Sequence, residues 1–350
     1  ARAVRNIART QLACGKLVSG EKMSQEAVEI FREENARRLE AEELQSLSTY
    51  LLAAGKPKAA LLAAERGLTI FRYLACPEAE EAQALLKVSQ CLLRLNKGQT
   101  ALTRGREAAS RFQVMEARNA EAMAMQVVAQ ALLQIGKKKE ALLAAQEAQE
   151  VAANNESLKA LAMKDEAFAL MAMDDYDEAI RRVQDASTLA AKANDLAVQA
   201  GILREAAQMH MNRGNFKEAL SSAREACEAS ERFGDKHSMA LALETVGMAQ
   251  GVQGNLQQAV TSAQECQELY QETGNPLGEE KALELLAKLK AAQGRIQDAL
   301  EAGEERLSVV RDHGNMSKEA DALHQVAGLH FQGGNIAVAE RTVKEARALA

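Results

Sequence analysis

A short phrase returns every forty residues through the second half of the chain. It reads Gly-Asn-Phe-Lys-Glu-Ala-Leu at 214–220, and related phrases begin at Gly254, Gly294 and Gly334. Another copy begins at Asp174, one begins two residues off register at 136, and weaker copies end at 101, 60 and 27, which makes nine candidate units. A repeat of this length predicts similar structural units that stack on their neighbours, instead of one large core.

Each unit is expected to hold two helices. A second set of Gly, Asn and Asp breaks runs at the same period, at 194–195, 234–235, 274–275 and 314–315, and leaves two stretches of roughly 16 to 18 residues per unit. Gly and Asn tolerate the left-handed conformation that ends a helix, and Asn or Asp caps the next one. With 3% aromatic residues and no Trp, the composition favours helices over sheets. Because the breaks are short, the two helices are expected to pack antiparallel as a hairpin.

Fixed offsets of small and large residues sharpen the register. If the alanine that closes each phrase is taken as a marker, a small residue stands twelve positions earlier in all nine units, and a large aliphatic residue stands sixteen earlier in eight of them. Small residues let two helix backbones approach closely, and the aliphatic side chain fills the space beside them. The markers are Ala27, Ala60, Ala101, Ala141, Ala179, Ala219, Ala259, Ala299 and Ala339, and the small residues are Gly15, Ser48, Ser89, Ala129, Ala167, Ala207, Gly247, Ala287 and Ala327.

The sequence resembles the tetratricopeptide repeat (TPR) family, whose pattern of large residue, small residue, loop Gly, Ala and Ala is met at Leu203, Ala207, Gly214, Ala219 and Ala226. Two features depart from that family: the unit has forty residues rather than about 34, and the Pro that often follows the second helix is missing. The longer unit is similar to the subclass found in Pins/LGN-type polarity adaptors and kinesin light chains. The resemblance implies an all-α, right-handed α-solenoid (a TPR-like superhelix) of about nine antiparallel helical hairpins.

The whole chain is expected to form one array. We predict a single TPR-like solenoid over 1–350, with degenerate repeats over about 1–115 and regular repeats over about 116–350. Residues 1–16 fit the first helix of a degenerate repeat, and the remnant of a targeting helix is the alternative. By the register the last helix extends to about residue 353, and no polar capping helix follows Ala350. Repeat arrays normally need such a cap, so we expect further chain or a neighbouring subunit to cover this end.

Charge, hydropathy and cysteine usage exclude several classes of partner. A formal net charge of -6 predicts no nucleic-acid partner, although the related pentatricopeptide arrays bind RNA. No apolar run approaches the ~20 residues of a membrane span, so direct membrane insertion is not expected. The five cysteines (Cys14, Cys76, Cys91, Cys227 and Cys266) form no Cys-x-x-Cys pair, which favours a soluble protein of a reducing compartment. The cytoplasm is the default, and an organelle interior is the alternative.

No pattern in the sequence predicts catalysis, a cofactor or a metal site. The five histidines include no i, i+4 pair, and the Gly-Lys pairs lack the residues that a phosphate-binding loop needs. Carboxylates such as Glu80, Glu81, Glu304 and Glu305 are expected on solvated helix faces, where they need no function. We therefore predict that the chain is not an enzyme.

The resemblance also implies where a partner would bind. In the TPR family the first helix of each hairpin lines a concave groove, with two positions per unit, fifteen and eleven residues before the marker alanine, directed into it. On this basis we predict partner-binding residues at Gln126, Gln130, Lys164, Phe168, Arg204, Gln208, Glu244 and Lys288, and the other groove positions are Gln45, Thr49, Leu86, Gln90, Met248, Glu284, His324 and Gly328. Chaperone-binding members clamp a carboxylate with Lys and Asn at these positions. No unit here has Asn at the second one, so that activity is not expected.

These observations favour a protein-interaction scaffold or adaptor that binds a peptide or partner subunit in its groove, as part of a larger complex. Long amide and charged side chains, with adaptable Met, suit an extended or helical peptide. One alternative is a structural subunit or linker of a larger multiprotein assembly that makes contacts through its ends and outer face. A ligand-sensing regulator would need an effector domain, which this sequence does not show.

Overall fold

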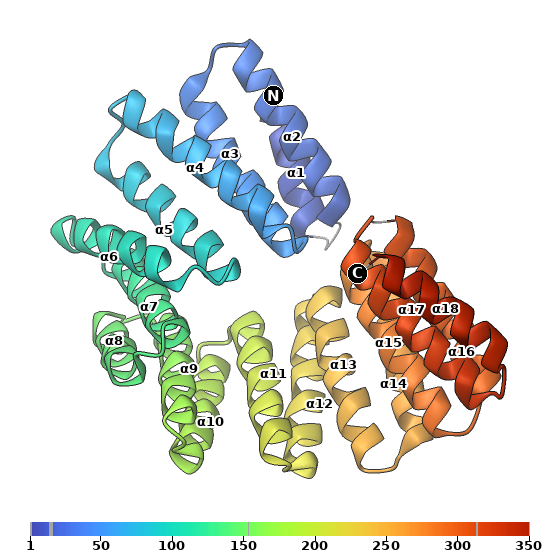
Figure 1. Ribbon diagram of the computed structural model, residues 1–350. Helices are drawn as coiled ribbons and strands as arrows, with labels where there is room; N and C mark the ends of the chain where they lie inside the picture. The colour runs from blue at the N-terminus through green and yellow to red at the C-terminus, as the bar shows by residue number, and fades with distance from the viewer. Residues whose placement is uncertain (1, 14–16, 153, 313, 350) are drawn as a thin grey trace. The chain divides into compact units, whose positions relative to one another are not determined.

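The structure, a computed structural model, describes residues 2–13, 17–152, 154–312 and 314–349. Cys14 and His313 lie outside these ranges, and so does Gly15, the small residue predicted for the first unit. Nearly all of the described chain is helical, and no strand occurs in it. The all-α class is therefore confirmed, and Figure 1 shows the helices in chain order.

Eighteen helices form in the described ranges, two for each predicted repeat unit. The first helix of each hairpin has an odd number and the second an even one. The first helices are α1 (Arg2–Ala13), α3 (Arg37–Ala53), α5 (Glu78–Arg94), α7 (Arg118–Gln134), α9 (Glu156–Ala172), α11 (Leu196–Arg213), α13 (Lys236–Val252), α15 (Pro276–Ala292) and α17 (Met316–Gln332). The second helices are α2 (Leu17–Glu33), α4 (Pro57–Tyr73), α6 (Gly98–Val114), α8 (Lys138–Val151), α10 (Tyr176–Lys192), α12 (Phe216–Phe233), α14 (Leu256–Thr273), α16 (Ile296–Asp312) and α18 (Ile336–Leu349).

The chain divides into two compact units, Ala1–Ile202 and Leu203–Ala350, with the boundary inside α11. In the first unit, successive helices from α1 through α10 pack on one another, and in the second unit successive helices from α12 through α18 do the same. Since only short turns join successive helices, the paired helices run antiparallel, as Figure 1 shows within each unit. The predicted helical hairpins are confirmed, whereas the single solenoid over 1–350 stays a prediction.

The breaks between helices use the conformations that their residue types predict. Gly214 and Gly234 have φ values of +80° and +79°, and Asn194 has +55°, all in the left-handed region. Five Asn and Asp side chains cap a first helix by accepting a hydrogen bond from the backbone N–H three residues on: Asn155, Asp195, Asp235, Asn275 and Asn315. These caps stabilise each helix start by about 1 kcal/mol and fix the point where one hairpin ends and the next begins.

Small residues lie where helices touch, as the offsets predict. The marker alanines are at most 6% exposed, and Ser48, Ser89 and Ala207 are fully buried. A Cβ added at Gly247 would lie 3.3 Å from the Leu285 side chain and 3.4 Å from the Ala259 carbonyl oxygen. The helices therefore approach too closely there for a larger residue to fit without a shift.

First helices also contact the first helices of neighbouring hairpins. In the first unit α3 touches α5, α5 touches α7, and α7 touches α9, while in the second unit α13 touches α15. The helices α3, α5, α7 and α9 therefore form a continuous surface in the first unit, and α13 and α15 do so in the second. We call the solvent-facing side of the odd-numbered helices in either unit the first-helix face of that unit.

Two carboxylates that the sequence analysis placed on a solvated helix face are covered instead. The side chains of Glu80 and Glu81, at the start of α5, are only 21% and 20% exposed. Arg72 and Arg111 pair with Glu81 at 2.8 and 2.7 Å, and Arg38 pairs with Glu80. That expectation was wrong for Glu80 and Glu81, because arginines from neighbouring helices pack over them.

Candidate partner-binding face

All eight predicted site residues lie on first helices. Four belong to the first unit and four to the second, and each unit presents its own group. In the first unit Gln126 and Gln130 lie on α7, and Lys164 and Phe168 lie on α9. In the second unit Arg204 and Gln208 lie on α11, Glu244 on α13, and Lys288 on α15.

Gln126 and Gln130 hold α7 to α9. Gln126 is 9% exposed, and its Nε2 donates a hydrogen bond of 3.0 Å to the carbonyl oxygen of Leu158. Gln130 is half-buried, and its Nε2 donates to both carboxylate oxygens of Asp165, at 3.0 and 3.2 Å. Because their amide N–H groups are used within the chain, what these two residues offer a partner is mainly their carbonyl oxygens.

Lys164 and Phe168 lie one turn apart on α9 and form a single charged and aromatic feature. The Lys164 Nζ lies 5.8 Å from the centre of the Phe168 ring and 3.4 Å from Asp165 Oδ1. Both side chains are half-buried. The ring and the carboxylate therefore position the ammonium group at the surface of α9.

The second unit presents a mixed set of charges. Arg204 pairs with the neighbouring Glu205, and Gln208 is exposed with its Nε2 donating to Asn212 Oδ1 at 3.0 Å. Glu244 is half-buried, and this burial raises the pKa of its carboxyl above the usual 4.5, against the lowering effect of Lys281. The charged form of Glu244 is therefore disfavoured by its surroundings.

Lys288 borders open space. It is 63% exposed, and its Nζ donates a 2.5 Å hydrogen bond to Glu284 Oε1, one turn earlier on α15. A cavity of about 450 Å³ lies between α15 and α17, and Lys288, His324 and Gly328 are among the residues that line it. Three positions that the sequence analysis assigned to the groove thus surround one hollow of this face.

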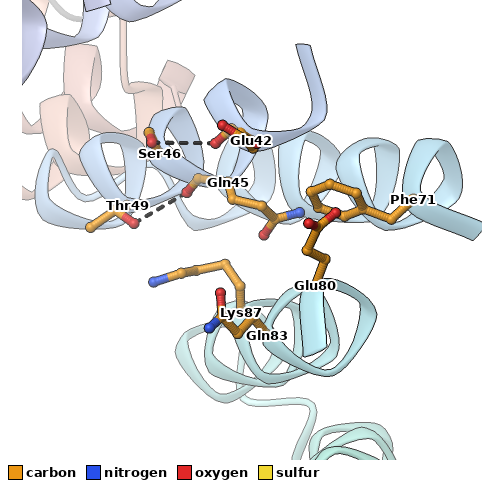
Figure 2. Close-up of a pocket in the computed structure, with 8 residues that line it drawn as sticks. All are labelled: Glu42, Gln45, Ser46, Thr49, Phe71, Glu80, Gln83 and Lys87. Atoms are coloured by element: carbon orange, nitrogen blue, oxygen red, sulfur yellow. Dashed lines mark hydrogen bonds between the residues drawn. The ribbon is translucent and has the colours of Figure 1, made fainter. Parts of the chain in front are cut away.

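A second cavity, of about 410 Å³, lies between α3 and α5 in the first unit (Figure 2). The groove positions Gln45 and Thr49 line it from α3, and Gln83 and Lys87 line it from α5. Figure 2 shows the Lys87 side chain reaching from α5 toward α3. This cavity is small for a ligand site but falls within the usual range.

Sequence reasoning missed two residues that matter on this face. Lys87 and Asp165 both stand fourteen residues before their marker alanine, one position after the first predicted groove position. Asp165 is 2% exposed and accepts a hydrogen bond from Gln130 Nε2, while Lys87 lines the cavity between α3 and α5. The signal available was a charged residue directly beside a predicted groove position.

The described residues contain no helix that is long and apolar enough to cross a membrane. Within the same ranges, no group of three or more His, Cys, Asp or Glu side chains is placed to hold a metal ion. The cysteines Cys76, Cys91, Cys227 and Cys266 are free thiols. Burial raises the pKa of the Cys227 thiol to about 12, so it stays protonated at neutral pH.

Comparison with known proteins finds similarity in structure alone. No protein-family model matches the chain, and no curated protein does. Yeast Tom70 is similar with a TM-score of 0.66 at 14% identity, over 93% of this chain and 63% of that one. A signal transduction ATPase with numerous domains and a tetratricopeptide repeat sensor, from Pyrococcus horikoshii, has a TM-score of 0.64 at 11% identity, over 97% of this chain and 51% of that one.

A Rap protein in complex with the competence and sporulation factor is also similar. Its TM-score is 0.54 at 13% identity, over 89% of this chain and 97% of that one. At such identities the likeness shows the fold, which is the TPR-like fold that the repeat pattern predicts. Membership of the long-unit subclass stays a prediction.

Proposed function

We propose that the chain is a non-enzymatic adaptor that binds a peptide or a partner subunit through its first-helix face. The observation that supports this proposal is a cavity on the first-helix face of each unit. Each lies between consecutive first helices and is lined by predicted groove positions. Space of this kind, surrounded by a few polar groups, accepts side chains of a partner.

The chemistry of the face suits a polar or charged partner. Gln208 and Lys288 are exposed, and Lys164 is held at the surface beside Phe168. Such long side chains adapt to a partner through hydrogen bonds and charge. The similar Rap structure, which is a complex with the competence and sporulation factor, supports a role in binding a partner.

A second candidate function is a structural subunit that makes contacts through its outer face and end. Large apolar side chains are exposed on second helices, with Leu62 at 70%, Val114 at 77% and Leu143 at 60%. At the last hairpin, Phe331 and Ile336 are 67% and 55% exposed and line a cavity of about 480 Å³ on α17 and α18. Exposed apolar groups of this size favour a further packed surface.

Site-specific photo-cross-linking in the cells that produce the protein separates these functions. A photoreactive phenylalanine analogue replaces Lys288 on the first-helix face, the exposed Glu301 on the second helix α16, or Ile336 on the second helix α18 of the last hairpin. The adaptor function predicts one discrete adduct from position 288, identified by mass spectrometry, and none from the other two. Adducts from 301 or 336 alone would contradict it and support the structural subunit.

A further inference from the structure

The cavity between α3 and α5 contains polar groups that the rest of the protein leaves unsatisfied. Two of its hydroxyl groups are used locally: Ser46 Oγ donates to the Glu42 carbonyl oxygen at 3.3 Å, and Thr49 Oγ1 donates to the Gln45 carbonyl oxygen at 3.2 Å (Figure 2). Phe71 forms an apolar wall. The groups left to bind a ligand are the side chains of Lys87, Gln45 and Glu80.

Lys87 supplies a positive charge without a counter-ion. Its side chain is half-buried, and no carboxylate among the described residues forms an ion pair with its ammonium group. This desolvation lowers the pKa of Lys87, which shows that the surroundings disfavour the charged form. A ligand carboxylate would remove that penalty.

Gln45 and Glu80 supply acceptors. Gln45 Nε2 donates to the Ala64 carbonyl oxygen at 3.1 Å, which fixes the orientation of the amide. Gln45 Oε1 and Glu80 Oε2 are then buried without a hydrogen-bond donor from the described residues. A buried acceptor without a donor costs about 1–3 kcal/mol, so a ligand N–H that reaches either atom is favoured.

The acidic residues of the cavity do not repel an anion, because arginines neutralise them. Glu42 pairs with Arg5 at 3.2 Å and with Arg38 at 3.8 Å, and Arg38 also pairs with Glu80. Lys87 is therefore the one uncompensated charge among the described side chains that line the cavity.

We propose that this cavity is an anchor site for an acidic side chain of a bound peptide, with the carboxylate on Lys87 and backbone N–H groups on Gln45 Oε1 and Glu80 Oε2. This inference rests on the proposed adaptor function and names the chemistry of one of its contacts. The site uses a position one residue beyond the predicted groove position, so it differs from the Lys and Asn clamp of the chaperone-binding TPR proteins.

Titration of the full chain, labelled with ¹⁵N, tests the site. The probes are acetyl-Gly-Glu-Gly-amide, acetyl-Gly-Gln-Gly-amide and free glutarate, each added to millimolar concentration. The Glu peptide is expected to shift the Gln45 side-chain amide signal saturably. The Gln peptide should bind at least about tenfold more weakly, which corresponds to roughly 1.4 kcal/mol. Glutarate carries two carboxylates and no backbone N–H groups, so binding equal to or tighter than that of the Glu peptide would overturn the peptide assignment in favour of a free carboxylate.

Variants of the lysine complete the test. Lys87→Met should lose the response to the Glu peptide and also raise the melting temperature, because it removes an unpaired, half-buried charge. Lys87→Arg should retain binding, and Lys58→Met, an exposed lysine of α4, is the matched control that should change nothing. Binding of the Glu peptide that survives in Lys87→Met, or no response of Gln45 to it, would overturn the anchor site. Position 288, the site of the cross-link, lies in the other unit, so the cross-linking experiment tests the adaptor function independently of the anchor site.

Discussion

The side-chain amide of Gln130 on α7 donates to both carboxylate oxygens of Asp165 on α9, at 3.0 and 3.2 Å. Asp165 is 2% exposed, so these hydrogen bonds satisfy a carboxylate that water does not reach. A residue predicted to face a partner thus also holds two neighbouring first helices together. Its substitution is expected to act on stability as well as on binding.

Replacing Gln130 by Leu should lower the free energy of unfolding by about 1–3 kcal/mol, because it removes hydrogen bonds to a buried charge. Urea denaturation followed by circular dichroism measures the change. Gln184→Leu, on the exposed side of α10, is the matched control and should stay within about 0.5 kcal/mol of the wild type. Equal effects of the two variants would show that the Gln130–Asp165 contact contributes little.

Arg306 and Glu280 form a buried ion pair between α16 and α15. Their side chains are 6% and 4% exposed, and Arg306 donates to Glu280 Oε1 at 2.7 and 3.1 Å. Arg306→Met leaves the Glu280 carboxylate paired with Lys318 alone and should lower the free energy of unfolding by about 3 kcal/mol. The double variant Arg306→Met, Glu280→Leu should lower it clearly less, because no buried carboxylate is left without its partner. A double-mutant cycle in urea measures both, and additive losses would refute the coupling.

Glu244 should make the protein less stable as the pH rises. Burial raises its pKa above 4.5 in the folded chain, so below that pH the carboxyl is protonated in both states and has no effect. As the pH rises through the folded pKa, the folded state loses a proton that it holds more tightly than the unfolded state does. Glu244→Gln should therefore raise the melting temperature more at pH 7 than at pH 4.

Two helical glycines should respond in opposite directions to alanine. A Cβ at Gly278 would lie 2.3 Å from ring carbons of the buried Tyr270, whereas a Cβ at Gly328 meets nothing within 4 Å. Gly278→Ala should lower the free energy of unfolding by about 1–3 kcal/mol through overpacking. Gly328→Ala should raise it by up to about 1 kcal/mol, because alanine has the higher helix propensity. Calorimetric melting temperatures check the signs, and a stabilised Gly278→Ala would show that Tyr270 yields easily.

The repeat pattern was sufficient to predict the hairpins, because the same backbone conformations recur along the chain. A left-handed φ such as that of Gly214 recurs at the breaks between helices, and a side-chain cap such as that of Asn275 recurs at the starts of the last five first helices, so both leave a signature at fixed spacing. The pairs Gln130–Asp165 and Arg306–Glu280 leave none, since each belongs to one interface. The position fourteen residues before the marker illustrates this, as it holds Ala13, Ser46, Lys87, Val127, Asp165, Glu205, Thr245, Leu285 and Gln325. Register therefore places a residue on a face, but only the folded neighbours decide its partner.

The central claim, that the first-helix face binds the partner, is tested most directly by one affinity comparison. The dissociation constant of the partner captured from position 288 is measured by calorimetry for the wild type, for Lys288→Glu, and for Lys217→Glu, which makes the same charge change at an exposed site on the second helix α12. We predict that Lys288→Glu weakens binding at least about tenfold, or roughly 1.4 kcal/mol, while Lys217→Glu leaves the dissociation constant unchanged. Equal constants for all three proteins, or a loss confined to Lys217→Glu, would contradict the claim.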